Sequence, residues 1–244
     1  MTTNSHHLIA KGAVKMSEEK KQDDMVEDLN ATGKIDTTIE GVSKSDDQWV
    51  EKAAKKVNAV EGNTYVKLDR GLLTVDQLNY FLNSMPLELT YADSNNQFLY
   101  YNNMMPTEKM LASRTPEQVG EALVNCHPKR AQKHVAQAIH ALRTGETDEI
   151  KMRVPTGPDK CIMHYYRAMH DKKGDYAGVN EYVLDLMPVI KWYLEKTGQK
   201  LVADPDAGSS ASLQDQPDDT SSASVDDEKK ENLVDDASSA SVND

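Results

Sequence analysis

Cysteine is scarce in this chain of 244 residues, which contains only Cys126 and Cys161 and no Cys-x-x-Cys spacing. A disulfide framework is therefore disfavoured, and a reducing compartment is indicated.

Long apolar runs are lacking as well. None approaches the roughly 18 to 20 residues that a membrane span requires, and the N-terminus has no apolar core of a secretory signal. We expect an intracellular, cytoplasmic protein with no membrane partner.

Clusters of basic residues are also missing. The chain has 28 Lys and Arg against 40 Asp and Glu, and most of its net charge of −12 lies at the C-terminus. Residues 204–244 hold twelve acidic side chains against two lysines, a net charge of −10. Nucleic-acid binding depends on clustered Lys and Arg, so we expect no nucleic-acid partner.

The C-terminal segment contains three near copies of one unit, "SSASLQD", "SSASVDD" and "SSASVND". Each copy has a single aliphatic side chain, which is too little to bury a core, so we expect residues 201–244 to form an acidic, Ser/Asp-rich disordered tail. Residues 1–44 are expected to be disordered for a similar reason, since residues 17–44 are polar, acidic and without apolar periodicity. The folded part of the chain should lie between these two segments.

Residues 45–68 are predicted to form a short amphipathic helix and a linker. The run Ser45-Asp46-Asp47-Gln48 has the pattern of a capping box, and apolar residues follow at helical spacing: Trp49, Ala53, Val57 and Val60. A second capping box, Thr74-Val75-Asp76-Gln77, precedes an apolar stripe that stops at Pro86. One apolar face on each helix needs a surface to cover it.

Residues 69–200 are predicted to form one domain. Two extended segments, 87–93 and 97–102, are joined by the turn Ser94-Asn95-Asn96. A long helix follows Pro128 and ends at Gly145. Three further strands are predicted at 147–154, 160–171 and 175–186, and then a helix at 189–201. Two strands separated by helices from three others indicate an α+β fold, in which one five-stranded antiparallel sheet carries helices on one face and leaves a pocket between them.

The run "LTVDQLNYFLNSMPLELTYADSNNQFLYYN" resembles the start of a PAS domain. The runs "RTPEQVGEALVNCHP" and "YYRAMHDKKGDYAGVNEYVLDL" resemble one branch of that family, which occurs in bacterial proteins beside a hemerythrin-like iron domain. The resemblance covers about residues 69–190 and implies a five-stranded antiparallel sheet with flanking helices. We expect neither a hemerythrin-like bundle before this domain nor an effector module after it. The resemblance therefore implies a sensory, ligand-binding or interaction module without catalytic activity, which signals through another molecule.

Cys126 and His127 are the first candidates for a site. A tetrahedral zinc site needs wider ligand spacing than adjacent residues provide, and a Cys-His enzyme needs an orienting group and an oxyanion site that the sequence does not supply. Cys126 is interpreted as a small, buried residue near the pocket. His127 precedes Pro128 at a helix start, where its side chain caps the backbone or contacts a ligand. Neither residue is expected to be catalytic.

Haem is the cofactor that the resemblance leaves open, because haem-binding PAS sensors hold iron through a histidine of the long helix. His134 lies on the flank of the apolar stripe, whereas His140 should face water. His134 or His127 would be the iron ligand, and without haem no metal is expected. Flavin is disfavoured, because His127 stands where flavin-binding relatives have an arginine. Further candidates for the pocket wall are Leu123, Tyr166, Met163 and Phe81.

A homodimer is the expected assembly, with the apolar faces of the helices at 46–60 and 74–85 as its contact surface. Otherwise the partner is an unidentified small ligand or signalling protein. Two alternatives stay open beside the sensory module. One is a stand-alone haem-binding sensor, and the other is a ligand-free dimerisation scaffold whose acidic tail recruits a partner.

Overall fold

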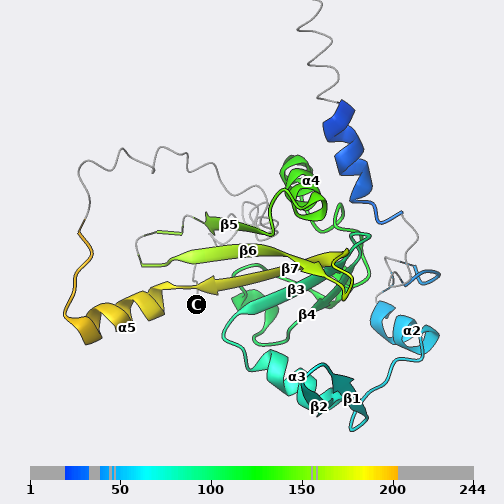
Figure 1. The fold of residues 1–244 in the computed structure, drawn as a ribbon, viewed down its shortest axis with the longest axis horizontal. Coiled ribbons are helices and arrows are strands. Elements are labelled where there is room, and N and C mark those ends of the chain that lie inside the picture. The colour runs from blue at the N-terminus through cyan, green and yellow to red at the C-terminus, as the bar shows by residue number, and fades with distance from the viewer. Residues whose placement is uncertain are drawn as a thin grey trace, which may run out of the picture.

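The computed structural model describes residues 20–32, 39–43, 46, 48–154, 156–157 and 159–202. Its centre is one five-stranded antiparallel sheet (Figure 1). The strands, in chain order, are β3 (Glu88–Asp93), β4 (Phe98–Tyr101), β5 (Glu149–Val154), β6 (Ile162–His170) and β7 (Tyr176–Asp185). Their order across the sheet is β4-β3-β7-β6-β5, so the last strand in the chain lies in the middle. The predicted sheet and its strand positions are confirmed.

Helices flank this sheet. They are α2 (Trp49–Lys56), α3 (Val75–Asn83), α4 (Lys129–Thr144) and α5 (Met187–Thr197), with two 3-10 turns at Thr107–Lys109 and Pro116–Gln118. The predicted capping box of α3 is present, because the Gln77 N–H donates to Thr74 Oγ1 and the Thr74 N–H donates to Gln77 Oε1. Gly145 ends α4 in the left-handed conformation, with φ at +72°. Both helix ends follow from local residue chemistry.

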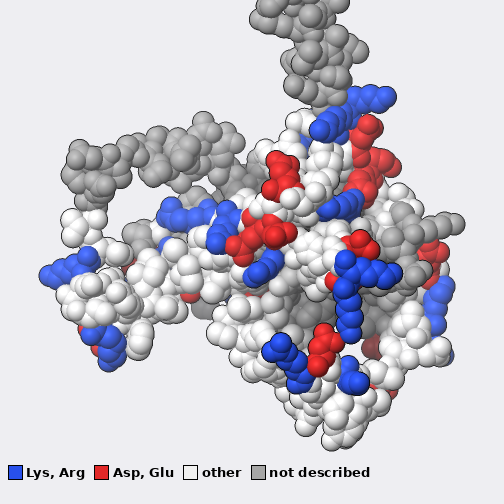
Figure 2. All heavy atoms as spheres, viewed as in Figure 1, with Lys and Arg blue, Asp and Glu red and all other residues white. Residues whose placement is uncertain are grey.

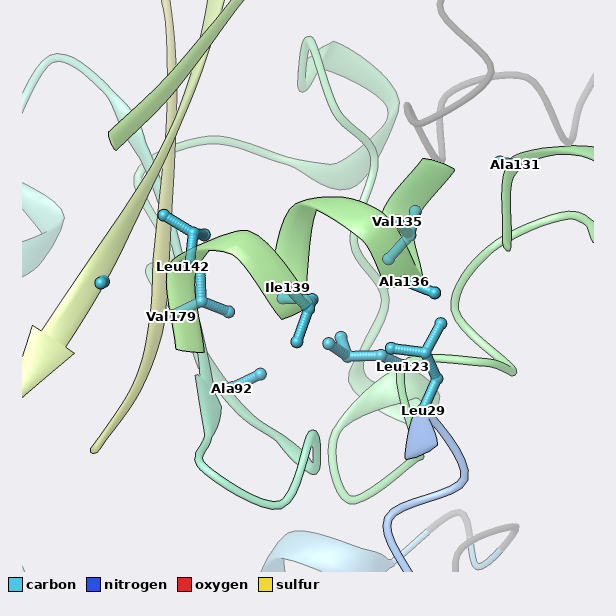
Figure 3. Close-up of a cluster of buried hydrophobic side chains, with 10 residues drawn as sticks. Leu29, Ala92, Leu123, Ala131, Val135, Ala136, Ile139, Leu142 and Val179 are labelled. Carbon is cyan, nitrogen blue, oxygen red and sulfur yellow. The ribbon is translucent and has the colours of Figure 1, made fainter. Parts of the chain in front are cut away.

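The main hydrophobic core lies between α4 and the inner face of the sheet (Figure 3). The apolar stripe of α4 supplies Val135, Ile139 and Leu142, which belong to one buried cluster with Ala92 of β3 and Val179 of β7. A second core cluster forms around Trp49 and Phe98. Burying these side chains contributes roughly 25 cal/mol for each Å² of apolar surface removed from water, and it fixes α4 over the sheet.

The expectation of disorder is wrong for part of the N-terminal segment. Residues 20–28 are helical, and Leu29 is buried with 1% of its surface exposed. Leu29 packs beside Leu123 and Ala136, and its carbonyl accepts a hydrogen bond from the Val124 N–H at 3.2 Å. Asp28 pairs with Arg143 of α4. This segment has few apolar residues, but they pack against α4. Counting the apolar residues of the segment alone cannot reveal that such a surface exists elsewhere in the chain.

Helix α2 is shorter than predicted and its apolar face is covered. It ends at Lys56, so Val57 and Val60 lie beyond it and are exposed. Trp49 packs directly on Gly120, whose φ is +95° and which has no room for a Cβ beneath the indole ring. Gln48 is the N-cap and makes no side-chain cap bond. The predicted capping box at 45–48 includes positions outside the described residues.

A two-stranded hairpin, β1 (Tyr65–Leu68) and β2 (Gly71–Thr74), was not predicted. It occupies part of the expected linker, immediately before α3. The alternation in these two strands is weak, and most of their residues are exposed. Sequence patterning therefore carried little signal for them.

Basic and acidic side chains are interspersed on the face of the molecule shown in Figure 2. Across the described part of the chain, no helix is both long enough and apolar enough to cross a membrane. The acidic segment from 203 onward and residues 1–19 lie outside the described residues, and so do the predictions of disorder made for them.

Candidate ligand-binding cavity

A cavity of about 590 Å³ lies between α4 and the inner face of the sheet. Its floor follows from strand register. Thr90 of β3 pairs with Glu181 of β7, Glu181 pairs with Tyr166 of β6, and Tyr166 pairs with Ile150 of β5. These four side chains form one row across four strands, and all four line the cavity. Alternation along each strand therefore places them on the same face.

The remaining walls are mostly aliphatic and come from α4, from residues just before and after it, and from further positions on β3, β5 and β7. The lining residues other than the floor row are Ala92, Leu123, His127, His134, Val135, Gln137, Ala138, Ile139, Ala141, Leu142, Glu146, Met152 and Val179. A volume of this size falls within the range of roughly 300 to 1,000 Å³ that is usual for small-ligand sites. Apolar walls with a few placed polar groups are also typical of such sites.

A buried ion pair underlies the floor of the cavity. Arg114, from the loop between the two 3-10 turns, pairs with the carboxylate of Glu181, and the two side chains are only 7% and 10% exposed. The guanidinium also donates to the carbonyl of Ser113 at 3.1 Å. Burial alone would raise the pKa of Glu181, but the attraction of Arg114 and a hydrogen bond from His164 outweigh it and hold that pKa well below its ordinary value. Glu181 is therefore an ionised carboxylate in the cavity wall.

His164 supports the same carboxylate from β6. It is buried, and its Nδ1 lies 3.1 Å from Glu181 Oε1. Since an ionised carboxylate can only accept, Nδ1 must carry the proton and donate. The hydroxyl of Tyr166 lies 3.5 Å from the same nitrogen. Arg114, Glu181, His164 and Tyr166 thus form one buried polar cluster beneath an apolar cavity.

Glu88 is a second buried carboxyl, on β3 beside β7. It accepts hydrogen bonds from the backbone N–H groups of Leu111 and Ala112. Burial raises its pKa, and those two hydrogen bonds oppose the rise without cancelling it. It is not among the residues that line the cavity. Its contacts fix the loop that carries Arg114, so its role is in positioning that loop.

Three of the six predicted site residues line the cavity: His127, His134 and Tyr166. His127 Nδ1 lies 2.8 Å from the Leu123 carbonyl, so the predicted backbone contact is present together with a place in the cavity wall. His134 lies on the exposed side of α4. His140, which was expected to face water, is partly covered and lies beside the helical segment 20–28.

The other three residues lie elsewhere. The thiol of Cys126 packs against the Trp49 and Phe98 cluster, and burial raises its pKa to about 12. Met163 lies on the opposite face of the sheet, because the inner positions of β6 are the even-numbered ones from Ile162 to Ala168. Phe81 is 56% exposed on α3. The expectation that Met163 and Phe81 line the pocket is therefore wrong, and Cys126 is partly buried and does not line the cavity.

The ion pair between Arg114 and Glu181 was missed by sequence reasoning. One signal for it exists, since Glu181 stands between Val179 and Val183 at inward-facing positions of a strand. A lone carboxylate at such a position requires a buried partner. Nothing local identifies that partner as Arg114, which is 67 residues away.

The described residues contain no group of three or more His, Cys, Asp or Glu side chains arranged to hold a metal ion. The side chains around the cavity suit an organic molecule, because they combine aliphatic walls with one buried carboxylate, two histidines and hydroxyl groups. Such a set can hold an apolar body and orient one polar group.

Comparison with known proteins agrees with this topology. A family model described as PAS domain matches residues 78–187. No curated protein matches the chain. Among solved structures, the C-terminal domain of a protein from Streptococcus mutans is 34% identical, with a TM-score of 0.51, and the match covers 54% of this chain and 99% of that one.

Two further solved structures are PAS proteins. The PAS domain of a protein from Colwellia psychrerythraea is 14% identical, with 46% of this chain and 97% of that chain covered and a TM-score of 0.33. The Aer2 receptor from Vibrio cholerae, described as a dual PAS-heme oxygen sensor, is 18% identical, with 41% and 94% covered and a TM-score of 0.31. The family match coincides with the sheet and with α4, and residues 78–187 of this chain therefore form a PAS domain.

Proposed function

We propose that this chain is a non-enzymatic sensory module, which binds a small ligand between α4 and the sheet and signals through a partner protein or a second copy. The observation that carries the proposal is the cavity of about 590 Å³, whose floor is a row of side chains from four strands. We take residues 69–200 as the extent of the module, in the cytoplasm. From its sequence motifs, we also propose that the module belongs to the branch of the family found beside hemerythrin-like domains.

A signal requires a ligand that binds two arrangements of the protein with different affinity. Helix α4 is suited to report such a difference, because one of its sides lines the cavity and another contacts the helical segment 20–28. Arg143 of α4 pairs with Asp28 and donates to Asn96 Oδ1 at 3.0 Å. Movement of α4 on ligand binding would therefore act directly on this N-terminal segment.

The test is native mass spectrometry of the full chain after gentle purification. We compare the wild type with Ala138→Phe, which fills the cavity from α4, and with Lys129→Phe, which adds the same ring at an exposed position of the same helix. A bound mass present in the wild type and in Lys129→Phe, and lost in Ala138→Phe, supports the proposal. A bound mass that survives Ala138→Phe contradicts it.

Haem is a second candidate, because His127 and His134 both line the cavity. Either imidazole could ligate iron, and haem would supply a gas-binding centre. The described lining contains no Lys or Arg to neutralise the two propionates of haem. The lining therefore offers a ligand for the iron but no partner for the propionates. Protein purified with supplied haem should show a Soret band that His134→Ala or His127→Ala removes. Absence of the band in the wild type excludes this candidate.

We also propose a homodimer. The apolar face of α2 is buried against other residues of the same chain, so α2 cannot supply its part of the expected dimer surface. Large apolar side chains are instead exposed on α3 and the neighbouring hairpin: Tyr65, Leu68, Leu72, Tyr80 and Phe81. Sedimentation analysis of Phe81→Asp, with Val57→Asp as the exposed control, tests this surface. Dimers without any bound mass, and loss of partner capture on removing 204–244, would favour the ligand-free scaffold instead.

A further inference from the structure

The charged groups that line the cavity have one sign. Glu181 lies in the floor and Glu146 at the end of α4, and of the described lining residues none is Lys or Arg. Arg114 compensates Glu181, but it is not itself a lining residue. A carboxylate or phosphate brought into this cavity would meet the like charge of Glu181 in a water-poor site, with neither Lys nor Arg among the described lining residues to pair with it.

The carboxylate of Glu181 retains capacity for a ligand. An ionised carboxylate offers about four acceptor positions. In the structure Oε2 accepts from Arg114, and Oε1 accepts from His164. Both contacts come from side chains that do not line the cavity, and they fix the orientation of the carboxylate. Glu181 itself lines the cavity. An atom that bonds to it from the cavity must be a hydrogen-bond donor.

The other polar groups of the wall do not reverse this preference. His127 already contacts the Leu123 carbonyl through Nδ1, at 2.8 Å. His134 and Glu146 lie on the exposed side, where water screens them. Thr90 and Tyr166 carry hydroxyls that can accept or donate. The buried end of the cavity is therefore selective for donors, and its aliphatic walls are selective for an apolar body.

Resting on the ligand-binding function proposed above, we infer that the cavity takes a neutral or singly cationic, largely apolar molecule with one hydroxyl, amine or N–H donor for Glu181. The same inference states that carboxylates of equal size are rejected. The preference arises from the direction of the hydrogen bond and from the sign of the charge at the cavity floor.

The experiment is isothermal titration calorimetry on the full-length protein with matched probes. Three frames are used, a linear ten-carbon alkyl chain, naphthalene and biphenyl, and each carries a hydroxyl, a methyl ether or a carboxylate. Losing a hydrogen bond to a charged acceptor weakens binding by about tenfold to a hundredfold. In each frame that binds, we expect the hydroxyl probe to bind at least about tenfold more tightly than its ether and its carboxylate.

Two variants locate the effect. Glu181→Gln keeps the size of the side chain and removes its charge, so the discrimination against carboxylates should shrink. Because this change leaves Arg114 without its counter-charge, Glu146→Gln serves as a second variant at an exposed position, and it should improve carboxylate binding by a smaller factor. The hydroxyl and ether series on the wild type does not depend on either variant.

The outcomes separate the two proposals. Carboxylates that bind as tightly as the hydroxyl probes would overturn the donor preference and leave the ligand-binding function standing. Binding that Ala138→Phe does not weaken would show that the probes sit outside this cavity, which contradicts both. If no frame binds in any form, the proposed function itself fails.

Discussion

Replacing Arg114 by Met removes the cation from the buried ion pair while it keeps most of the side-chain length. The carboxylate of Glu181 is then left in a position where 10% of the side chain is exposed, and the carbonyl of Ser113 loses a donor. Removing one partner of a buried ion pair costs far more than the net contribution of the pair, because an uncompensated charge stays behind. The variant should therefore fold with a much smaller free energy of unfolding.

The expected loss is about 3 to 5 kcal/mol near neutral pH. For a domain of this size such a loss lowers the melting temperature by roughly 6 to 20 °C. Removing both charges, in Arg114→Met with Glu181→Gln, should recover part of the loss, because no buried charge then remains unpaired. That recovery distinguishes the ion pair from a simple packing effect of the arginine stem.

The pH dependence of the variant should differ from that of the wild type. In the wild type the folded pKa of Glu181 is below its ordinary value of 4.5, so its stabilising contribution is present above that pH and is lost as the pH falls. In the variant we expect burial, the largest influence on this carboxyl, to raise the folded pKa of Glu181 above the unfolded one. A raised carboxyl pKa stabilises the fold at low pH, and this contribution is lost as the pH rises through it. The cost of the substitution should thus grow with pH.

Guanidinium denaturation at about pH 5 and about pH 7.5 measures this difference, with the fluorescence of the buried Trp49 as the signal. Arg153→Met removes an exposed strand arginine and serves as the control, with an expected change within about 0.5 kcal/mol. A loss below about 1 kcal/mol at both pH values, or one that does not increase with pH, would refute the assigned role of the pair.

Three further predictions concern other parts of the fold. Leu29→Ala should lower the free energy of unfolding by about 2 to 5 kcal/mol in denaturant titrations, whereas a disordered segment would show no effect. In a Cys161→Ser background, iodoacetamide should modify Cys126 slowly at pH 8 until the protein is unfolded, because burial raises the thiol pKa to about 12. Gly178→Ala should destabilise more than Gly174→Ala in thermal melts, since a Cβ at 178 would lie 2.2 Å from a backbone oxygen while that at 174 meets open space.

Much of the fold was predictable because its signals are local. The capping box at Thr74, the turn after Asp93 and the glycine at 145 each act within a few residues, and the structure has all three. Alternation along β6 also explains why His164 and Tyr166 lie on the same face of the sheet.

The candidate site was predictable only in part, because its residues meet across long separations in the chain. Met163 and Tyr166 lie in the same strand but on opposite faces of the sheet. The sequence alone did not show which of these faces carries the cavity. The docking of Leu29 depends on a groove formed by α4 and the loop before it. Neither surface exists until the sheet has formed.

The sequence by itself determined the five strands of the sheet and the positions of α3 and α4, but not the hairpin of β1 and β2 or the helical segment 20–28. Periodicity and capping act over a few residues, and they suffice for that. Tertiary structure alone decided that Arg114 reaches Glu181, that three of the six candidate residues face one cavity, and that an N-terminal segment is held against α4. Pairing a buried charge and covering an apolar surface are properties of the assembled chain, since their free energy depends on burial that no single segment provides.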